Sequence, residues 1–545
     1  MFFQISSRTN LRTLFGIALA SVILILQFQA CTNIAESRSE ILGCDPLGYS
    51  QQARIFRSSD KISNKFITDL KGNVYENLRD WASTTSLSNE DWYQMIAPHC
   101  HHYRDSSGLI IDQYPFGTGW LLSLLPEKYA RRWLIIISIS IIAGISIGKI
   151  LLEQSFSQKI FRTINAIILI QIIQDFWNRS DSLAPSVLIA FIAAEIAIKY
   201  SNHTFLANGN KSIYSLLLGL VLGFSICIRP GNLFFSFAAI LSILLIITSR
   251  ITSKKEFIRV ASWGSLGYLP GVIANAYFNL ANTGSALQTT YTTIDTSFAN
   301  NTTTILGNIG KIPDENGTSL ILVSAFLLLI SLLKAILLSK NFMGDKFLLR
   351  SNAIILTTAW SSLILFIIIC LSKNVFISYY LAAQVAFMSS LVCCCNVSQS
   401  TSQLQQALHI QKDNIRPFAM RTIALVLISI NIFVMAQTLL ETKEISINKN
   451  PLPLMDTNNT ILWADSTGSY LYWHYGIPTA KLLFGSDKAQ TEVIKYLQVK
   501  GVTQLFMDEN NLVSQVSSID PANSLELIGQ FREINIYKLK QFIVN

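Results

Sequence analysis

The chain has 545 residues, of which 50% are hydrophobic and only 14% are charged. This composition lies outside the range of soluble globular proteins and indicates a protein that crosses a membrane several times. The formal net charge of +9 does not indicate a nucleic-acid partner. Lysines and arginines fall mostly in short segments between apolar runs, which is the distribution that sets membrane topology.

The first apolar run covers residues 13–30 and follows Arg8 and Arg12. It predicts a spanning helix whose N-terminus is cytoplasmic. Cys31 at its end gives a passing likeness to a lipoprotein signal, but the residues before this cysteine fit poorly and more membrane segments follow. We therefore expect an uncleaved helix.

Residues 31–132 form a polar segment that holds most Trp, His and acidic residues of the N-terminal half. Phe116–Leu125 is too short to cross a bilayer, since a spanning helix needs about 20 apolar residues. We expect it to lie in or re-enter the interface with Trp120 as an anchor. Cys44 and Cys100 could form a disulfide in an oxidising compartment or stay free thiols.

Further apolar runs predict more spanning helices. They lie at about 133–152, 163–178, 183–199, 213–228, 232–249, 261–279, 318–338, 351–371, 375–395 and 419–438. With the first helix they predict a mostly α fold, a polytopic membrane bundle of about 11 spanning helices. Its membrane domain would cover residues 1–438, with outer loops at 31–132 and 280–317.

Basic residues support this count through the positive-inside rule. They gather in the connections that the count places in the cytoplasm, the first of which holds Lys149, Lys159 and Arg162. Counting Phe116–Leu125 as a span would place these connections outside. The count also places the C-terminus on the extracytoplasmic side.

A small extracytoplasmic α/β domain is expected at residues 439–545, after a polar linker with two prolines. Residues 461–464 and 502–507 have the pattern of strands, and Ser486 or Asp487 would cap a helix between them. Residues 525–539 predict a closing hairpin.

Asp45 begins an amphipathic segment in the first outer loop, because Tyr49, Ala53 and Phe56 recur at helical spacing. An acidic residue followed by Pro46 is also an ordinary helix start, with the Asp as cap. The two roles are compatible, since a cap at the membrane edge also fixes a carboxylate in place.

The histidines His99, His101 and His102 could bind a divalent metal, donate to a phosphate or pack in the structure. Their spacing is a weak zinc signature, and no Cys or Glu completes a ligand set. In isolation, residues 114–117 predict a turn. Residues 229–231 predict a tight outer turn whose arginine could contact lipid phosphates or extend along the membrane.

Ionisable residues are nearly absent from the middle third of the predicted spans, which argues against a transporter. The polar groups gather instead at the expected outer surface, which indicates a site at the boundary of lipid and water. They include Asp45, Asp105, Asp112, the histidines, Asp181, Arg229 and Tyr291.

These motifs resemble the membrane-embedded glycosyltransferases of the GT-C class, which include protein O-mannosyltransferases and bacterial aminoarabinose and lipopolysaccharide sugar transferases. That class has an acid and a following Tyr after the first helix, a Pro-Pro segment before the second, a basic outer turn and a later outer-loop motif. The corresponding residues are Asp45 and Tyr49, Tyr114 to Gly117, Arg229-Pro230, and Gly284-Ser285 through Tyr291.

The chain departs from the class at two points. Asp45-Pro46 stands where many members have two adjacent acids, and Pro115-Phe116 stands where two prolines are usual. The resemblance covers the membrane portion and is strongest in its N-terminal part. The fold assignment does not depend on either departure, whereas the catalytic roles do.

The resemblance implies an enzyme that moves a sugar from a polyprenyl-phosphate donor to a hydroxyl of a glycan, lipid or protein acceptor, usually with inversion. Asp45 would be the general base and Asp181 a second acid. The resemblance also implies a set of substrate-binding residues, in which the arginines would contact the phosphate. They are Tyr49, His101, His102, Arg104, Tyr114, Arg131, Arg132, Arg229 and Tyr291.

The same resemblance places the protein in a plasma membrane, in contact with membrane lipids. No cofactor is required by these motifs, although a Mg²⁺ or Mn²⁺ ion could hold the departing phosphate. Two other hypotheses stay open, a transporter or flippase for a glycolipid and a non-catalytic scaffold.

Overall fold

A computed structural model describes the protein over much of its length. The described residues are 2–36, 44–58, 67–68, 73–85, 101–104, 109–153, 155–177, 180–202, 208–250, 254–289, 327, 360, 377–394, 458–464, 477–480, 487–508, 525–531 and 534–540. The chain divides into two compact units. The helical unit comprises Met1–Ser37, Pro115–Ala276 and Thr296–Thr442, and the sheet unit comprises Arg38–Tyr114, Tyr277–Asp295 and Lys443–Asn545. Parts of the predicted outer loop 31–132 therefore belong to each unit.

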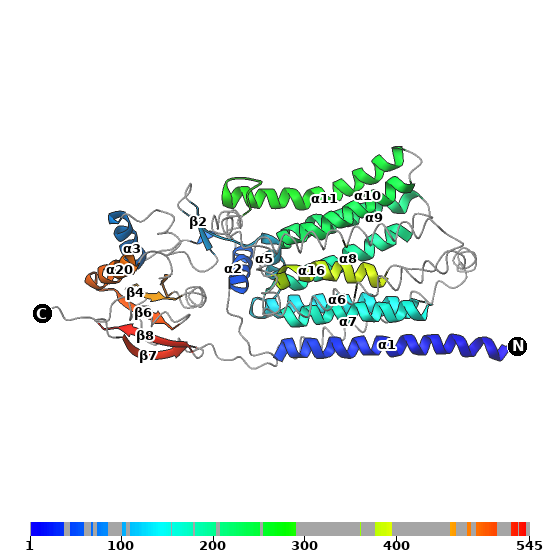
Figure 1. The fold of residues 1–545 in the computed structure, drawn as a ribbon, viewed down its shortest axis with the longest axis horizontal. Coiled ribbons are helices and arrows are strands. Elements are labelled where there is room, and N and C mark those ends of the chain that lie inside the picture. The colour runs from blue at the N-terminus through cyan, green and yellow to red at the C-terminus, as the bar shows by residue number, and fades with distance from the viewer. Residues whose placement is uncertain are drawn as a thin grey trace, which may run out of the picture. The chain divides into compact units, whose positions relative to one another are not determined.

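The helical unit is built from long apolar helices that lie alongside one another (Figure 1). The described helices of this unit, short ones included, are in chain order α1 (Phe2–Glu36), α5 (Phe116–Ser123), η1 (Glu127–Tyr129), α6 (Ala130–Leu152), α7 (Phe156–Phe176), α8 (Leu183–Asn202), α9 (Asn208–Ile228), η3 (Pro230–Asn232), α10 (Leu233–Arg250), α11 (Lys254–Thr283) and α16 (Ile377–Cys394). The last residues of α11, from Tyr277 onward, are counted with the sheet unit.

Five of the described helices are long and apolar enough to cross a membrane, at Leu11–Glu36, Glu127–Leu152, Phe156–Asp175, Leu183–Tyr200 and Lys211–Ile228. This confirms a mostly helical, multi-pass membrane protein, because a helix satisfies all of its backbone hydrogen bonds internally in lipid. The predicted count of about 11 spans is not confirmed. Apart from Leu327 and Trp360, the predicted spans at 318–338, 351–371 and 419–438 lie outside the described residues.

The start of α7 differs from the sequence prediction. The helix begins at Phe156 rather than near residue 163, so Lys159 and Arg162 lie inside it and not in a connection. Each of the two side chains forms a hydrogen bond there. Lys159 Nζ donates to the Arg12 carbonyl at 3.1 Å, and Arg162 Nη1 donates to Glu195 at 3.0 Å. An apolar run in the sequence ends at a charged residue, whereas a helix can continue through charged residues that have partners.

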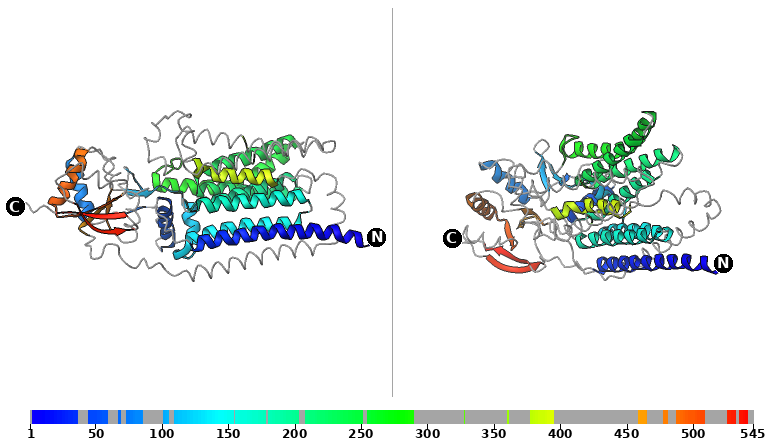
Figure 2. Two further views of the ribbon diagram at one scale, coloured as in Figure 1. Left: turned by 60° about the horizontal axis from the view of Figure 1, so that its bottom comes forward. Right: turned by 45° about the vertical axis from the view of Figure 1, so that its right-hand side comes forward.

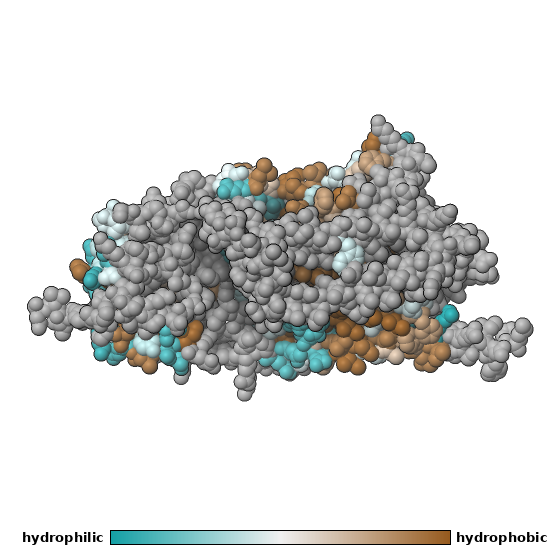
Figure 3. Space-filling view, viewed as in Figure 1, coloured by the Kyte–Doolittle hydropathy of each residue, from teal (hydrophilic) through white to brown (hydrophobic). Residues whose placement is uncertain are grey.

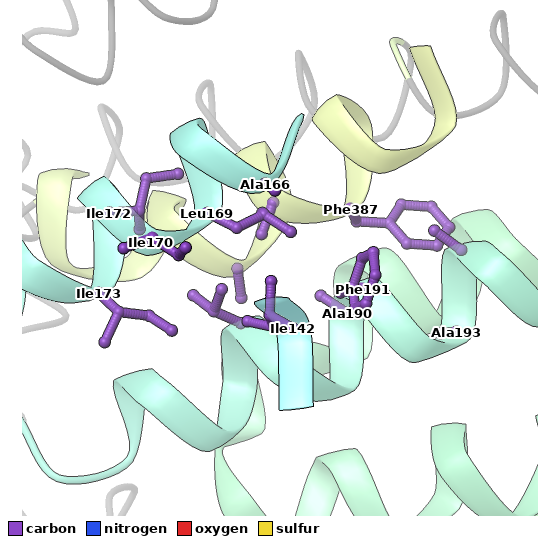
Figure 4. Packing of buried hydrophobic residues seen from close by; sticks show 14 of the residues in the cluster. Ile142, Ala166, Leu169, Ile170, Ile172, Ile173, Ala190, Phe191, Ala193 and Phe387 are labelled. Carbon is purple, nitrogen blue, oxygen red and sulfur yellow. The ribbon is translucent and has the colours of Figure 1, made fainter. Parts of the chain in front are cut away.

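The core of the helical unit is apolar and continuous. α1 packs on α6 and α7, and α16 packs on α7 and α8, an arrangement that the views of Figure 2 also show. Figure 4 shows Ile142 of α6, Leu169 of α7, Phe191 of α8 and Phe387 of α16 meeting in this core. All four side chains are almost fully buried.

Four glycines set the approach of α9 and α11, Gly219 and Gly223 on α9 and Gly267 and Gly271 on α11. A Cβ at Gly219 would overlap the carbonyl of Gly264, and a Cβ at Gly223 would overlap the backbone of Tyr268. The two helices therefore contact each other backbone to backbone, as small residues allow in membrane proteins. Cys227 Sγ extends the contact and donates to the Gly271 carbonyl at 3.2 Å.

Large apolar side chains also cover the outside of this unit, where hydrophobic surface gathers in Figure 3. Leu14 and Ile25 on α1 and Leu266 and Ile273 on α11 are exposed. Lipid is the medium in which such exposure carries no penalty.

In the part that the structure describes, the sheet unit has two sheets and the helices α2, α3 and α20. Its three-stranded antiparallel sheet has the order β1-β3-β2, and its five-stranded sheet has the order β5-β4-β6-β8-β7. The elements are α2 (Cys44–Arg57), β1 (Ile67–Thr68), α3 (Asn73–Thr84), β2 (His101–Arg104), β3 (Leu109–Asp112), β4 (Thr460–Trp463), β5 (Thr479–Ala480), α20 (Asp487–Val499), β6 (Thr503–Met507), β7 (Leu525–Phe531) and β8 (Ile534–Leu539). The C-terminal strands, helix and hairpin agree with the sequence prediction, whereas the smaller sheet was not predicted.

Helix α3 of the outer loop completes the core of the C-terminal sheet. Tyr75 and Trp81 of α3 join the hydrophobic cluster that contains Trp463 of β4 and Phe506 of β6. The Tyr75 hydroxyl accepts the N–H of Thr479 at 2.9 Å, across 404 positions of sequence. A segment near the N-terminus and the C-terminal segment therefore share one core.

Candidate functional site

Helix α2 carries Asp45 in its first turn, directly before Pro46. An acid suits this place because the helix dipole is positive at the N-terminus, and a proline suits it because its missing N–H would have no helical partner. The side chain of Asp45 is half-buried. The structure thus agrees with the helix start that the sequence predicts, and the role of Asp45 as a base stays a prediction.

Helix α2 is buried on more than the one face that the residue spacing predicts, because most residues from Pro46 to Ala53 are buried. Tyr49 is buried, and the ring of Phe56 meets that of Phe278 edge-on, with 5.9 Å between centroids. Leu47 joins a hydrophobic cluster of the five-stranded sheet. Gln52 lies in the same helix and is fully buried, although its type and position gave no reason to select it from the sequence.

Two side chains hold the backbone of Tyr114 beside α2. Gln52 Nε2 donates to the Tyr114 carbonyl at 2.7 Å, and the Tyr114 N–H donates to Asp112 Oδ1 at 3.0 Å. The ring of Tyr114 packs on that of Tyr49, with 4.7 Å between centroids, and fills the space where a side chain at Gly48 would be. We call Gln52, Asp112 and Tyr114 the tyrosine clamp. The clamp joins two segments that the sequence analysis selected separately.

Asp112 is one of the polar groups that the sequence places at the outer surface, but no role in the site was predicted for it. Its carboxyl group is fully buried, and Oδ2 has no hydrogen-bond partner among the described residues. Burial raises the pKa of Asp112 to about 8, the Tyr114 N–H opposes this rise, and the nearby charge of Asp45 adds to it. A single Asp at the end of a strand has the sequence pattern of a surface residue, so no local signal marks it.

Asp181 is paired with Arg131 in the helical unit. Arg131 Nε lies 2.6 Å from one carboxylate oxygen and 2.7 Å from the other. Burial raises the pKa of Asp181, and the charge of Arg131 opposes this rise. Arg131 Nη2 is buried and has no hydrogen-bond partner in the described part of the chain. Asp181 therefore orients a cation, and its predicted role as a catalytic acid stays a prediction.

Arg229 lies at the turn between α9 and α10 and is buried. Asn232 fixes this turn, because its Nδ2 donates to Ser186 Oγ at 3.0 Å and to the Ser225 carbonyl at 2.9 Å. Gln384 of α16 donates to the Gly231 carbonyl at 3.2 Å. The turn is thus held from three helices.

Helix α5 contacts the end of α9 directly before this turn. A Cβ at Gly117 would overlap the backbone of Cys227, and Thr118 Oγ1 donates to the Ile228 carbonyl at 3.4 Å. Trp120, the predicted interfacial anchor, packs edge-on against Phe224. Two more segments that were selected separately, 114–117 and 229–231, are therefore close to each other.

Arg132 has a partner of a different kind. Its Nη1 donates to the Ala35 carbonyl in the last turn of α1 at 3.1 Å. Carbonyl groups at a helix C-terminus lack helical partners, so this bond caps α1. A phosphate-binding role for Arg132 stays a prediction.

Other predicted site residues are described only in part. His101, His102 and Arg104 lie in β2, where His101 pairs in register with Asp112, but their side chains are outside the described set. Tyr291 and the Cys44–Cys100 disulfide also lie outside it.

The described residues hold no group of three or more His, Cys, Asp and Glu side chains that could bind a metal. They do not supply the donor set that Mg²⁺ or Mn²⁺ requires, so we assign no step to an ion.

No protein-family model matches the chain, and no curated protein matches it in sequence. The solved structures similar to the chain include two of an archaeal oligosaccharyltransferase. One is the Archaeoglobus fulgidus enzyme in complex with Zn and sulfate, at 10% identity and a TM-score of 0.42, covering 95% of this chain and 73% of that chain.

Another is AglB from the same organism, in complex with an inhibitory peptide and a dolichol-phosphate. The identity is 11% and the TM-score 0.43, with 96% of this chain and 75% of that chain covered. A TM-score below 0.5 is too low to support a mechanism, so the case for function rests on the residues of this chain.

Proposed function

We propose that the chain is a glycosyltransferase that moves a sugar from a polyprenyl-phosphate donor to a hydroxyl acceptor at the outer face of a plasma membrane. The acceptor would be a glycan, a lipid or a protein, and the N-terminus would be cytoplasmic. The observation that carries this proposal is the tyrosine clamp, because it joins the Asp45 and Tyr114 motifs of the GT-C-like pattern in one unit.

Asp45 is the general base in this proposal. The acceptor hydroxyl oxygen attacks the anomeric carbon, the carbon–oxygen bond to phosphate breaks, and Asp45 takes the hydroxyl proton. The polyprenyl phosphate leaves with the electron pair of the broken bond. Attack from the side opposite the phosphate inverts the configuration of the sugar.

Arginines of the helical unit hold the departing phosphate. Arg131 is the best placed by chemistry, because Asp181 engages its Nε and leaves Nη2 without a protein partner among the described residues. Guanidinium groups bind phosphate through charge-assisted hydrogen bonds. In this proposal Asp181 positions Arg131, and Arg229 supplies a second cation from its fixed turn.

The experiment compares cells that lack the gene with cells that carry the wild-type chain. Mass spectrometry measures lipid-linked sugars and surface glycans in both. We expect loss of one glycosidic linkage and accumulation of its lipid-linked donor in cells that lack the gene. An unchanged glycan profile would overturn the proposal. Counterflow of a labelled glycolipid in proteoliposomes without glycan product would instead identify a flippase.

A further inference from the structure

Asp112 ends the central strand of the small sheet, where β3 pairs with β1 on one side and β2 on the other. Its carboxyl group is completely buried. Oδ1 accepts the Tyr114 N–H, and Oδ2 has no partner in the described residues. Natural proteins rarely leave a buried carboxylate oxygen in this state, so the carboxyl group calls for a physical explanation.

Within the described part of the chain, Gln52 also has one polar atom with a hydrogen-bond partner and one without. Its Nε2 donates to the Tyr114 carbonyl, while its Oε1 is buried and has no partner among the described atoms. The two side chains thus engage both backbone polar groups of Tyr114 and each retains one acceptor oxygen. A proton on Asp112 Oδ2 makes this oxygen a donor and removes the negative charge, whose burial without a partner is costly.

Among the described side chains, the charge that acts on Asp112 favours the same state. Asp45 of α2 is the ionisable group whose charge acts on it, and the sign is repulsive. From the other packed elements, β1 contributes uncharged residues, β2 contributes His101 as register partner, and the chain after β3 contributes Gln113 and Tyr114. Asp112 is fully buried whereas Asp45 is half-buried, so Asp112 is the carboxyl group that keeps its proton.

We propose that Asp112 is a positioning residue that works in its protonated form, holding Tyr114 on α2 and leaving Asp45 as the anion of the pair. The inference rests on the proposed function for its link to catalysis. It goes further by naming a residue outside the GT-C-like motifs and by assigning its charge state. The raised pKa of Asp112 is consistent with this state at neutral pH.

The test uses two variants of the full-length protein. Asp112→Asn has the shape of a protonated acid, since its oxygen accepts the Tyr114 N–H and its amide donates. Asp112→Ala removes both functions. We expect Asp112→Ala to lower glycan formation in complemented cells by about tenfold or more, and Asp112→Asn to restore most of that loss.

A pH profile and an infrared measurement distinguish a role that requires the proton on Asp112 from a role in stability alone. Wild-type transfer in membranes should fall as the pH rises through about 8, because Asp112 then ionises beside Asp45, and Asp112→Asn should lack this fall. At neutral pH, the wild-type infrared spectrum should contain a protonated-carboxyl C=O band that Asp112→Asn lacks. Asp80→Asn, an exposed acid on α3, is the matched control and should retain the band.

Each contrary result overturns the inference. If Asp112→Asn loses as much transfer as Asp112→Ala, Asp112 works as an anion. If Asp112→Ala retains wild-type transfer, Asp112 positions nothing. If the infrared band is present in Asp112→Asn, the proton belongs to another group. The infrared result does not require activity, so failure of the proposed function and failure of this inference are distinguishable.

Discussion

Two buried carboxylates in different units of this protein have opposite surroundings. Glu195 in the helical unit contacts two cations, Lys149 and Arg162, while Asp112 in the sheet unit is acted on by another acid. A buried anion that is matched by cations has a structural explanation in its own neighbourhood. A buried acid whose neighbours oppose its charge is instead a candidate for a functional role.

The largest expected effect comes from removing the matched anion. Glu195→Ala would leave the buried Arg162 and the part-buried Lys149 without their carboxylate, and among the described residues Arg162 would keep the 4.0 Å contact with Glu153. We expect a loss of about 3–5 kcal/mol in the free energy of unfolding. Thermal unfolding in detergent measures it, with the exposed Glu36→Ala as control. Equal stability of the two variants would show that the cluster is not a structural ion-pair site.

A smaller loss of stability is expected when the tyrosine clamp is broken. Gln52→Leu removes the donor to the Tyr114 carbonyl and leaves that buried oxygen without this hydrogen bond. The free energy of unfolding of the sheet unit should fall by about 1–3 kcal/mol, with a loss of transfer of about tenfold.

Gln530→Ala provides the matched control for the clamp. Gln530 Nε2 donates to Asn535 Oδ1 at 3.1 Å in an exposed hairpin, so its loss should change stability by no more than about 0.5 kcal/mol. If Gln52→Leu changes stability and transfer as little as this control, the clamp does not hold the site.

The most gradual effect is the titration of Asp112, which is spread over several pH units. Its pKa is raised from 3.8 to about 8, so the folded state retains a proton that the unfolded chain loses. The stabilisation is full below about pH 4 and declines as the pH rises to about 8, by at most about 1.4 kcal/mol per pH unit. Unfolding temperatures measured across this window should show the decline in the wild type and not in Asp112→Asn. Parallel curves would contradict the assignment.

The sequence predicts the membrane helices better than it predicts the site. Apolar runs locate the helices because lipid enforces both length and composition. The predicted start of α7 was wrong, because Lys159 and Arg162 lie inside the helix and have partners that only the folded chain provides. Helix α2, which has Asp45 in its first turn, was predicted from its proline and its apolar spacing, both of which are local signals.

Contacts between distant segments could not be predicted from local pattern. Tyr75 contacts Thr479 across 404 positions, and Gln52 contacts Tyr114 across 62. Neither pair has a spacing or composition that identifies its partner. Asp112 was missed for the same reason, because its burial depends on α2 and on strands that are separate in the sequence.

The central claim, that Asp45 is the base of a membrane glycosyltransferase, is tested most directly by Asp45→Asn. Complemented cells are compared by mass spectrometry of glycans and lipid-linked sugars, with Asp80→Asn as the exposed control in the same unit. We predict that Asp45→Asn lowers product by about 100-fold or more and accumulates donor, while the protein stays folded in membranes. Wild-type amounts of product from Asp45→Asn would contradict the account.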